Sequence, residues 1–491
     1  MNKISLIFVL VLFLSACSDF LEEYSQDQYH PKNVIDLNEL LIGSGYWGDL
    51  KFGELNSLND DVREVRGTEF EIPPAIFGFY TWQEFPHYSE EDKVWQDIYK
   101  SIGVANSIIT KIEDFTGDDL YNKVKGEAYF IRGASYFLLA NLYALPYTRE
   151  TAANTLGVPL KLNNYVTGRE WSRTPLDSVY HSVVRDLQTA ANCLKGVAQP
   201  SIFRANEYAA HALLSRVYLY MGEYENAITS SNYVLETPNY SVTSLAGASV
   251  DSCFTTLARP EIIFSQGGYT SPVTGITSVG TWNMASYYMR PSKDLLSRYT
   301  VNDLRMASFF RQRGVIYQCY KTAYDDTYAV SDFGMLRLSE VILNKAEAQA
   351  LVGQEGEAVK TLENLLRGRY SKIPVVPEAG RELIDWIRDE RRRELCFEGH
   401  RWFDLRRYAV DAKYPFTKEI VHVVNFYDNK GFSTVNEPRE VYRLVPYDVD
   451  NRKWCLPIPG YETKLTELMV QNERYESEFE AYDKEKHEQY E

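Results

Sequence analysis

The sequence has a deficit of positive charge, few cysteines and no long hydrophobic run. Its 52 Lys and Arg face 68 Asp and Glu, and the formal net charge of -16 opposes general binding to nucleic acid or anionic membranes. Apart from Cys17, five cysteines remain, an odd number without CxxC spacing, which argues against a disulfide framework and a zinc site. We expect them to be small core residues. With 491 residues, 45% of them hydrophobic, the chain can bury one or two large cores.

Common catalytic and cofactor motifs are also absent from the sequence. It contains no HExxH motif, no phosphate loop ending in Gly-Lys-Ser/Thr, no GxSxG elbow and no complete calcium loop. The sequence therefore predicts no catalytic residue, no metal ligand and no cofactor.

Residues 388–407 contain the nearest approach to a catalytic cluster. Glu390, Glu394 and Glu398 follow one another at i, i+4 spacing, and glycoside hydrolysis does need two carboxylates. Seven arginines are interleaved with them: Arg388, Arg391, Arg392, Arg393, Arg401, Arg406 and Arg407. Such pairing lowers the pKa of a carboxyl group instead of producing a general acid, so we predict a structural ion-pair network here.

The first 16 residues have the pattern of an export signal. Lys3 is the only charged residue before the apolar run from Leu6 to Leu14, and small residues follow. The nine apolar residues of this run fall well short of the roughly 20 that a membrane-spanning helix needs, which favours a cleaved signal. Leu14-Ser15-Ala16-Cys17 resembles the lipobox of bacterial lipoproteins, which implies that Cys17 is acylated and anchors the mature chain.

Most of the remaining sequence predicts helices. Apolar residues recur at helical spacing over residues 95–112, 127–143 and 174–194, with Thr174 as the candidate N-cap of the last helix. Residues 213–235 have the spacing of a tetratricopeptide repeat, and residues 340–366 form a weaker copy. Two such repeats need neighbours to cover their apolar faces, so we expect the other helices to supply them.

Two segments interrupt the helical pattern. Residues 66–91 contain three prolines and seven aromatic residues, and residues 267–290 are rich in Gly, Ser and Thr before an aromatic end. Both predict long ordered loops, which are often functional. We expect ligand-stacking rings at Tyr80, Trp82, Trp282, Tyr287 and Tyr288, and polar ligand contacts at Asp60, Asp61 and Asn283. The alternative for the rings is packing against the scaffold, and for the polar residues a turn or cap role.

Several motifs resemble one known family in the same order along the chain. The strongest lie at Glu390-Arg391, Glu394-Leu395, Phe397-Glu398-Gly399 and Asp404-Leu405-Arg406-Arg407, and others at Cys17-Ser18-Asp19-Phe20-Leu21-Glu22, Arg173-Thr174-Pro175 and Leu456-Pro457-Ile458-Pro459. They resemble the SusD/RagB family of outer-membrane nutrient-binding lipoproteins. One departure is Gln471-Asn472-Glu473-Arg474, where the family commonly has Gln-Asn-Pro-Gly-Tyr.

The resemblance implies a mostly α fold, in which tetratricopeptide-like helix pairs form a scaffold with long irregular ligand-binding loops and a few short strands. It implies a signal peptide at residues 1–16, a SusD-like helical region at 17–260 and a RagB/SusD-type region at 261–491, the last two packed as one globular unit. It also implies a lipid-anchored outer-membrane protein that faces the cell exterior. Its implied partners are a TonB-dependent outer-membrane transporter and a nutrient oligomer, and not nucleic acid.

The type of ligand and activity stays open among several hypotheses. Binding of an oligosaccharide without cleavage is the leading one, because sugar rings stack on aromatic side chains and their hydroxyls need polar partners. A peptide ligand in the same fold is the next alternative. A surface glycoside hydrolase would need an unpaired pair of carboxylates, and a purely structural scaffold would leave the aromatic loops unexplained.

Overall fold

The computed structural model describes most of the chain downstream of the predicted signal. It describes residues 31–47, 53–64, 72–86, 92–165, 171–250, 254–266, 289–314, 316–321, 330, 334–430 and 433–490. Cys17 and four of the predicted ligand contacts, Trp282, Asn283, Tyr287 and Tyr288, lie outside these ranges. Their roles stay predictions.

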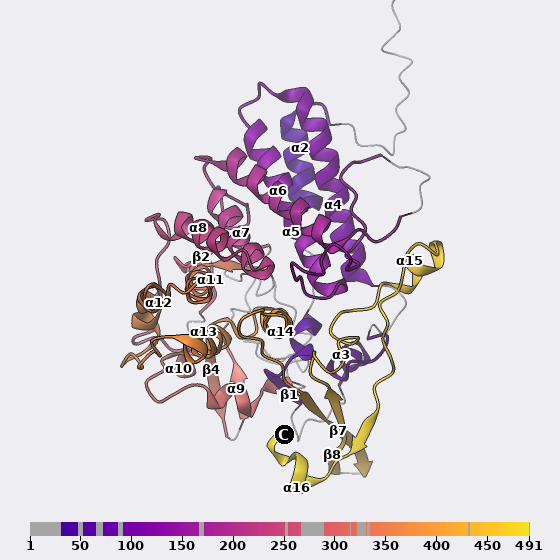
Figure 1. The fold of residues 1–491 in the computed structure, drawn as a ribbon, viewed down its shortest axis with the longest axis vertical. Helices are drawn as coiled ribbons and strands as arrows, with labels where there is room; N and C mark the ends of the chain where they lie inside the picture. The colour runs from indigo at the N-terminus through magenta and orange to yellow at the C-terminus, as the bar shows by residue number, and fades with distance from the viewer. Residues whose placement is uncertain are drawn as a thin grey trace, which may run out of the picture.

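The first half of the chain forms layered helices in the upper part of Figure 1. They are α2 (Val34–Leu40), η1 (Leu41–Gly45), α4 (Lys93–Lys111), η3 (Ile112–Phe115), α5 (Tyr121–Tyr143), α6 (Leu176–Leu194), α7 (Glu207–Met221) and α8 (Tyr224–Leu235). Helix α5 is the central one, packed between α4 and α6 and buried along nearly its whole length from Val124 to Tyr143. Consecutive helices therefore pack against one another, and the helices predicted over residues 95–112, 127–143 and 174–194 correspond to α4, α5 and α6.

The two predicted tetratricopeptide-like repeats are helix pairs in the structure. The first is α7 with α8, and the second is α11 (Leu338–Leu351) with α12 (Glu355–Arg369). Gly222 and Gly353 end the first helix of each pair with φ of 72° and 85°, in the left-handed region that favours glycine. Helix α11 packs on both α7 and α8, although about a hundred residues separate the pairs. Helices α13 (Gly380–Leu395) and α14 (Arg401–Ala409) follow.

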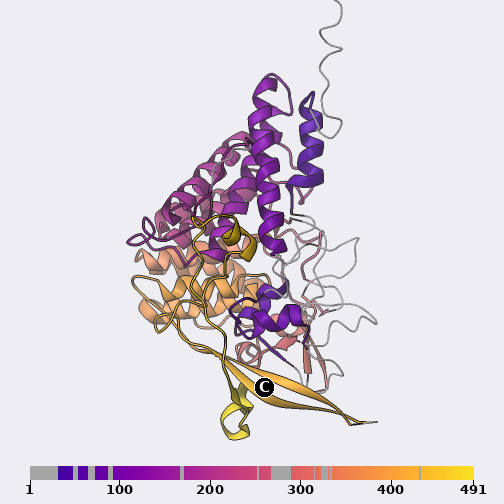
Figure 2. The same cartoon turned by 90° about the vertical axis from the view of Figure 1, so that its right-hand side faces the viewer.

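The strands form small sheets and one long hairpin. Short antiparallel pairs join β1 (Val62–Glu64) to β3 (Met289–Pro291), β2 (Ile262–Phe264) to β6 (Leu336–Arg337) and β4 (Phe310–Arg313) to β5 (Ile316–Cys319). The hairpin joins β7 (Ile420–Lys430) to β8 (Ser433–Leu444), and β9 (Phe479–Ala481) extends it. In Figure 2 the hairpin extends away from the helical layers. Its register shifts beside Asn425, opposite Pro438, which lets a proline sit inside a strand.

Some local predictions need correction. Residues 66–91 were expected to be loop, but α3 (Pro74–Tyr80) lies among them, because Pro73 and Pro74 have the fixed φ that suits the first turn of a helix. Helix α6 begins after Pro175, and the Thr174 hydroxyl accepts a hydrogen bond from the Leu160 N–H at 3.2 Å instead of capping the helix. The remaining short elements are η2 (Gly53–Leu58), α9 (Lys293–Ser297), α10 (Arg305–Phe309), α15 (Gly460–Leu465), α16 (Lys484–His487) and η7 (Glu488–Tyr490).

The largest cluster of buried apolar side chains runs from Val34 near the beginning of the described chain to Met469 near its end. Cys319, Cys396 and Cys455 are buried, as predicted for small core residues, whereas Cys193 is partly exposed. Cys253 lies outside the described ranges. No helix among the described residues has both the length and the apolar character needed to cross a bilayer.

Candidate functional site

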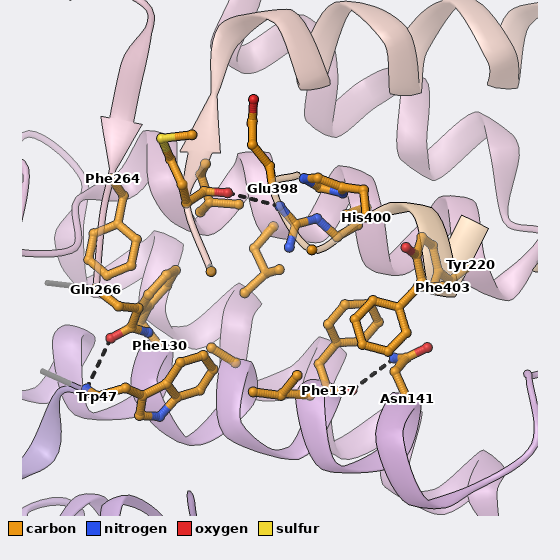
Figure 3. A pocket seen from close by; sticks show the side chains of 18 residues that line it. Trp47, Phe130, Phe137, Asn141, Tyr220, Phe264, Gln266, Glu398, His400 and Phe403 are labelled. Carbon is orange, nitrogen blue, oxygen red and sulfur yellow. Dashed lines mark hydrogen bonds between the residues drawn. The ribbon is translucent and has the colours of Figure 1, made fainter. Parts of the chain in front are cut away.

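An aromatic pocket lies where α5 and α7 meet the strands β2 and β6 and the turn between α13 and α14. Figure 3 shows its side chains arranged around a cavity of about 60 Å³. Its aromatic members are Trp47, Phe130, Phe137, Tyr220, Phe264 and Phe403, and its polar members are Asn141, Arg216, Gln266, Glu398 and His400. We refer to these residues together as the aromatic pocket.

Helical periodicity brings the α5 and α7 residues to the pocket. On α5, Phe130, Phe137 and Asn141 are seven and four residues apart, so their side chains lie on one face of the helix. On α7, Arg216 and Tyr220 share a face in the same way. The Phe137 and Tyr220 rings lie 5.3 Å apart between centroids, so the two helices form one aromatic wall.

Hydrogen bonds fix the polar side chains of the wall. The Asn141 amide donates to the Phe137 carbonyl at 2.8 Å, and Gln266 Oε1 accepts from the Trp47 backbone N–H at 3.3 Å. Arg216 donates to Glu340 Oε2 at 2.6 Å and to the Met335 carbonyl at 3.2 Å. The polar groups of the pocket are therefore held in place before any ligand arrives.

His400 occupies the turn that closes one side of the pocket. The turn requires left-handed backbone at Phe397 and Gly399, with φ of 62° and 76°. Burial lowers the pKa of His400 well below its usual value, and the nearby cations Arg216 and Arg391 lower it further. His400 is therefore neutral at pH 7.

The carboxylates that resembled a catalytic cluster belong to a buried ion-pair network. It consists of Glu261, Asp303, Glu390, Glu394 and Glu398 with Arg305, Lys321, Arg337, Arg369 and Arg393. Glu394 is at its centre and accepts from Arg337 at 2.6 Å, from Arg369 at 2.9 Å and from Arg305 at 3.1 Å. A structural ion-pair network is confirmed, but its partners differ from the expected ones. Of the seven arginines interleaved with the glutamates, Arg393 alone pairs with one of the three in the described chain, and the other partners come from distant segments.

The network keeps its carboxylates ionised. Burial alone would raise the pKa of Glu390, Glu394 and Glu398, but the adjacent guanidinium groups lower it overall. One detail differs from the expected helical face: α13 ends at Leu395, so Glu398 lies in the following turn and joins the network through Arg337 at 2.8 Å. None of the three is suited to act as a general acid.

Tyr80 and Trp82 are packed in the interior and do not present ring faces to solvent. Both side chains are fully buried, and the His422 ring lies between them at centroid distances of 4.0 Å and 4.4 Å. Trp82 Nε1 donates to the Leu58 carbonyl at 3.0 Å. The structure thus supports the packing alternative for these two residues, because their planar faces are already occupied by the imidazole.

Asp60 and Asp61 are likewise engaged within the protein. Asp60 accepts from Arg401 at 2.7 Å and from Lys418 at 2.7 Å, and Asp61 accepts from Arg392 at 2.7 Å. Both carboxylates are buried and paired with cations, and their predicted contacts with a ligand stay predictions. Two acidic residues are buried here because they pair with Arg392 and Arg401, which would otherwise be unpaired charges in the interior.

The sequence does not mark the aromatic pocket as a site. Phe130, Phe137 and Tyr220 occupy apolar positions of predicted helices, where core packing is the expected role. The only signal was aromatic residues recurring on one face of α5 and α7, and their common cavity follows from packing between distant segments. Among the described residues, no group of three or more His, Cys, Asp and Glu is placed to hold a metal ion.

Two models of known protein families match the chain. The model described as "SusD family" matches residues 260–475, and the model described as "Starch-binding associating with outer membrane" matches residues 19–219. The chain belongs to the SusD family. The resemblance inferred from the Glu390 to Arg407 motifs is thereby confirmed.

Relatives and solved structures agree with this assignment. Among curated proteins of Formosa agariphila, SusD-like protein P2 is 24% identical over 97% of this chain and 100% of its own length, and SusD-like protein P38 is 24% identical over 67% and 75%. A putative sugar binding protein from Bacteroides vulgatus has a TM-score of 0.71 at 23% identity over 91% of this SusD-family chain and 100% of its own. A SusD superfamily protein from Bacteroides thetaiotaomicron has a TM-score of 0.67 at 23% identity over 89% of this chain and 97% of its own. The predicted fold class is confirmed.

The buried His422 predicts a pH dependence of stability. Burial lowers the pKa of His422 to about 4, although its contacts with the Tyr80 and Asn59 carbonyls raise it. The unfolded chain binds this proton at about pH 6.5, so acidification from there favours the unfolded state, by about 2 to 3 kcal/mol at pH 4.5. The free energy of unfolding of the wild type should therefore decrease between pH 7.5 and pH 4.5. In His422→Asn this decrease should be smaller by about 2 to 3 kcal/mol, which urea titrations at each pH measure.

The exposed His181 provides the control for this measurement. His181→Asn should keep the wild-type slope, because its ring is already in solvent in the folded protein. A slope that is the same in His422→Asn as in the wild type would contradict the assigned protonation state.

Proposed function

We propose that this protein binds glycans at the cell surface and holds them for uptake without cleaving them. The observation that carries this proposal is the aromatic pocket, in which several rings and a few fixed polar groups surround one cavity. Sugar rings have apolar C–H faces that pack on aromatic rings and hydroxyl groups that need polar partners. Similar solved structures include a putative sugar binding protein and a SusD-like carbohydrate binding protein, both from Bacteroides vulgatus.

Binding without hydrolysis is favoured by the state of the carboxylates. Hydrolysis of a glycoside requires a carboxylic acid whose pKa is raised and a second carboxylate placed across the bond. Glu390, Glu394 and Glu398 have lowered pKa values and are held by arginines in the interior. Peptide binding is the alternative that a ligand screen distinguishes.

We also propose a location and a partner for this function. Acylation of Cys17 after export would attach the protein to the outer membrane, facing the cell exterior, and a lipid tether raises its local concentration beside other membrane proteins. A captured oligomer is useful to the cell only if a transporter receives it, so the proposed partner is a TonB-dependent outer-membrane transporter. The lipobox sequence and the family membership support this placement.

Phe403 tests the proposed glycan site. Its ring is partly buried at the pocket, so Phe403→Ala should remove one stacking face while leaving the helices intact. We expect the affinity for a bound oligosaccharide to fall by about fivefold, which corresponds to about 1 kcal/mol. Isothermal titration calorimetry with an oligosaccharide panel measures this change.

Phe416 supplies a matched control for Phe403. Its side chain is 37% exposed and is not part of the aromatic pocket, so Phe416→Ala should bind as the wild type does. Chromatography of the incubated oligosaccharides detects any cleavage. Released products would favour a hydrolase, and binding of peptides but not of any glycan would favour the peptide alternative.

The anchor is tested by replacing Cys17. Without its thiol, Cys17→Ala has no acyl acceptor, so cells fed labelled palmitate should incorporate no label into the protein, and the chain should accumulate as precursor or in soluble form. Cell fractionation should find almost none of the Cys17→Ala protein in the membrane fraction. A Cys193→Ala variant is the control and should label as the wild type does. Membrane-bound, labelled Cys17→Ala would contradict the proposed anchor.

A further inference from the structure

The hydrogen-bonding groups of the aromatic pocket are unevenly distributed between acceptors and donors. Every amide and carboxylate oxygen on its wall already accepts a hydrogen bond: Asn141 Oδ1 from Tyr180, Gln266 Oε1 from Trp47, and both Glu398 oxygens from Arg337. A ligand that enters the pocket therefore meets no unoccupied amide or carboxylate acceptor on the described wall.

Three nitrogen donors of the wall have no hydrogen-bond partner among the residues that the structure describes. Arg216 uses Nε and Nη2 for Glu340 and the Met335 carbonyl, and within the described residues Nη1 has no hydrogen-bond partner. Gln266 Nε2 has none there either. Neither nitrogen is among the buried, unpartnered atoms of the described chain, so both keep some access to open space. Each can donate to a ligand.

The third donor is His400. Its Nδ1 lies 3.5 Å from Arg391 Nη2, and because a guanidinium nitrogen can only donate, Nδ1 is the accepting nitrogen. The proton of the neutral ring is then on Nε2, which has no partner among the described residues and is not sealed from solvent. Four cations, Arg216, Arg391, Arg337 and Lys321, disfavour a positive charge on this ring. Each of them is already paired with a carboxylate: Glu340, Asp404 or the wall residue Glu398.

The size of the cavity limits what can fill it. One water needs on the order of 10 to 15 Å³ of such space, so the cavity of about 60 Å³ holds a group of a few atoms and not a complete sugar ring. A small substituent can enter, while the ring that carries it packs on Phe403, the partly exposed aromatic residue of the described pocket.

The geometry points to a carboxylate as the group that enters the aromatic pocket, and therefore to an acidic glycan containing uronic acid units as the ligand. This inference rests on the proposed glycan-binding function and specifies its substrate class. A carboxylate brings only acceptor oxygens, which match the free donors of Arg216, Gln266 and His400. The apolar face of the sugar ring then packs on the partly exposed Phe403.

Paired oligosaccharides test this inference directly. Oligomers of galacturonate and of mannuronate are titrated into the full mature chain beside their carboxyl-reduced, neutral counterparts, and calorimetry measures each affinity. We expect at least one acidic oligomer to bind about tenfold or more tightly than its neutral counterpart. Raising the salt concentration from about 20 mM to about 500 mM should weaken only the acidic complex, because screening acts on charge pairs.

A charge-reversing variant gives a second measurement. In Gln266→Glu, one carboxylate oxygen can still accept from the Trp47 N–H, but the free amide donor becomes an anionic oxygen. Binding of the acidic oligomer should fall by about tenfold or more, and by a larger factor than binding of the neutral counterpart. Gln188→Glu is the matched control, because the Gln188 amide donates to the Tyr218 hydroxyl at 2.9 Å away from the pocket.

The outcomes separate this inference from the function on which it rests. Neutral oligomers that bind as tightly as acidic ones, or acidic binding that ignores salt, would overturn the inference and leave glycan binding intact. If Gln266→Glu fails to fold, the salt series and the paired ligands of the wild-type chain still decide. Binding of acidic peptides with no binding of any glycan would remove the proposed function itself.

Discussion

The buried ion-pair network around Glu394 is the constraint on which the architecture depends. Charges removed from water are tolerated only when each has a partner and a good hydrogen-bond geometry, and here five acidic and five basic residues meet this requirement together. Its members come from segments far apart in the sequence. Glu261 directly precedes β2, Arg337 lies in β6, Arg369 is the last residue of α12, and Glu394 lies in α13. None of these segments can move away without leaving a charge unpaired.

The same network supports the aromatic pocket. Glu398 is both a member of the network and part of the pocket wall, and Arg337, which binds it, lies in strand β6 beside the wall residue Leu336. The turn that carries His400 directly follows Glu398. A rigid charged layer thus positions one side of the pocket, while α5 and α7 of the helical layers position the other. The site combines local helical periodicity with long-range charge pairing.

The helices and their pairing could be predicted because amphipathic periodicity and glycine at Gly222 and Gly353 are local signals. The ionised state of Glu390, Glu394 and Glu398 was also predictable, since they stand among many arginines. Their main partners were not, because Arg305, Arg337 and Arg369 come from distant segments. Helix α3 and the β7–β8 hairpin were missed, because Pro74 and Pro438 stand inside them and proline usually marks a loop.

The binding residues were harder to predict, because a ring has the same sequence signature in a core as at a site. Tyr80 and Trp82 belong to an aromatic loop in the sequence, yet His422, more than three hundred residues away, occupies their faces in the structure. Phe137 and Tyr220 follow helical spacing, yet they border a cavity. Only contacts between distant segments separate the two cases, and single-sequence patterns do not contain them.

The most direct test of this account is the free energy of unfolding of Glu394→Gln, compared with Glu363→Gln. Glu394 is fully buried among three arginines, so removing its charge should cost about 3 to 5 kcal/mol. Glu363 pairs with Arg367 on the exposed face of α12, so its substitution should change stability by less than about 1 kcal/mol. Equal, small losses in both variants would contradict the claim that the network holds the fold and its pocket together.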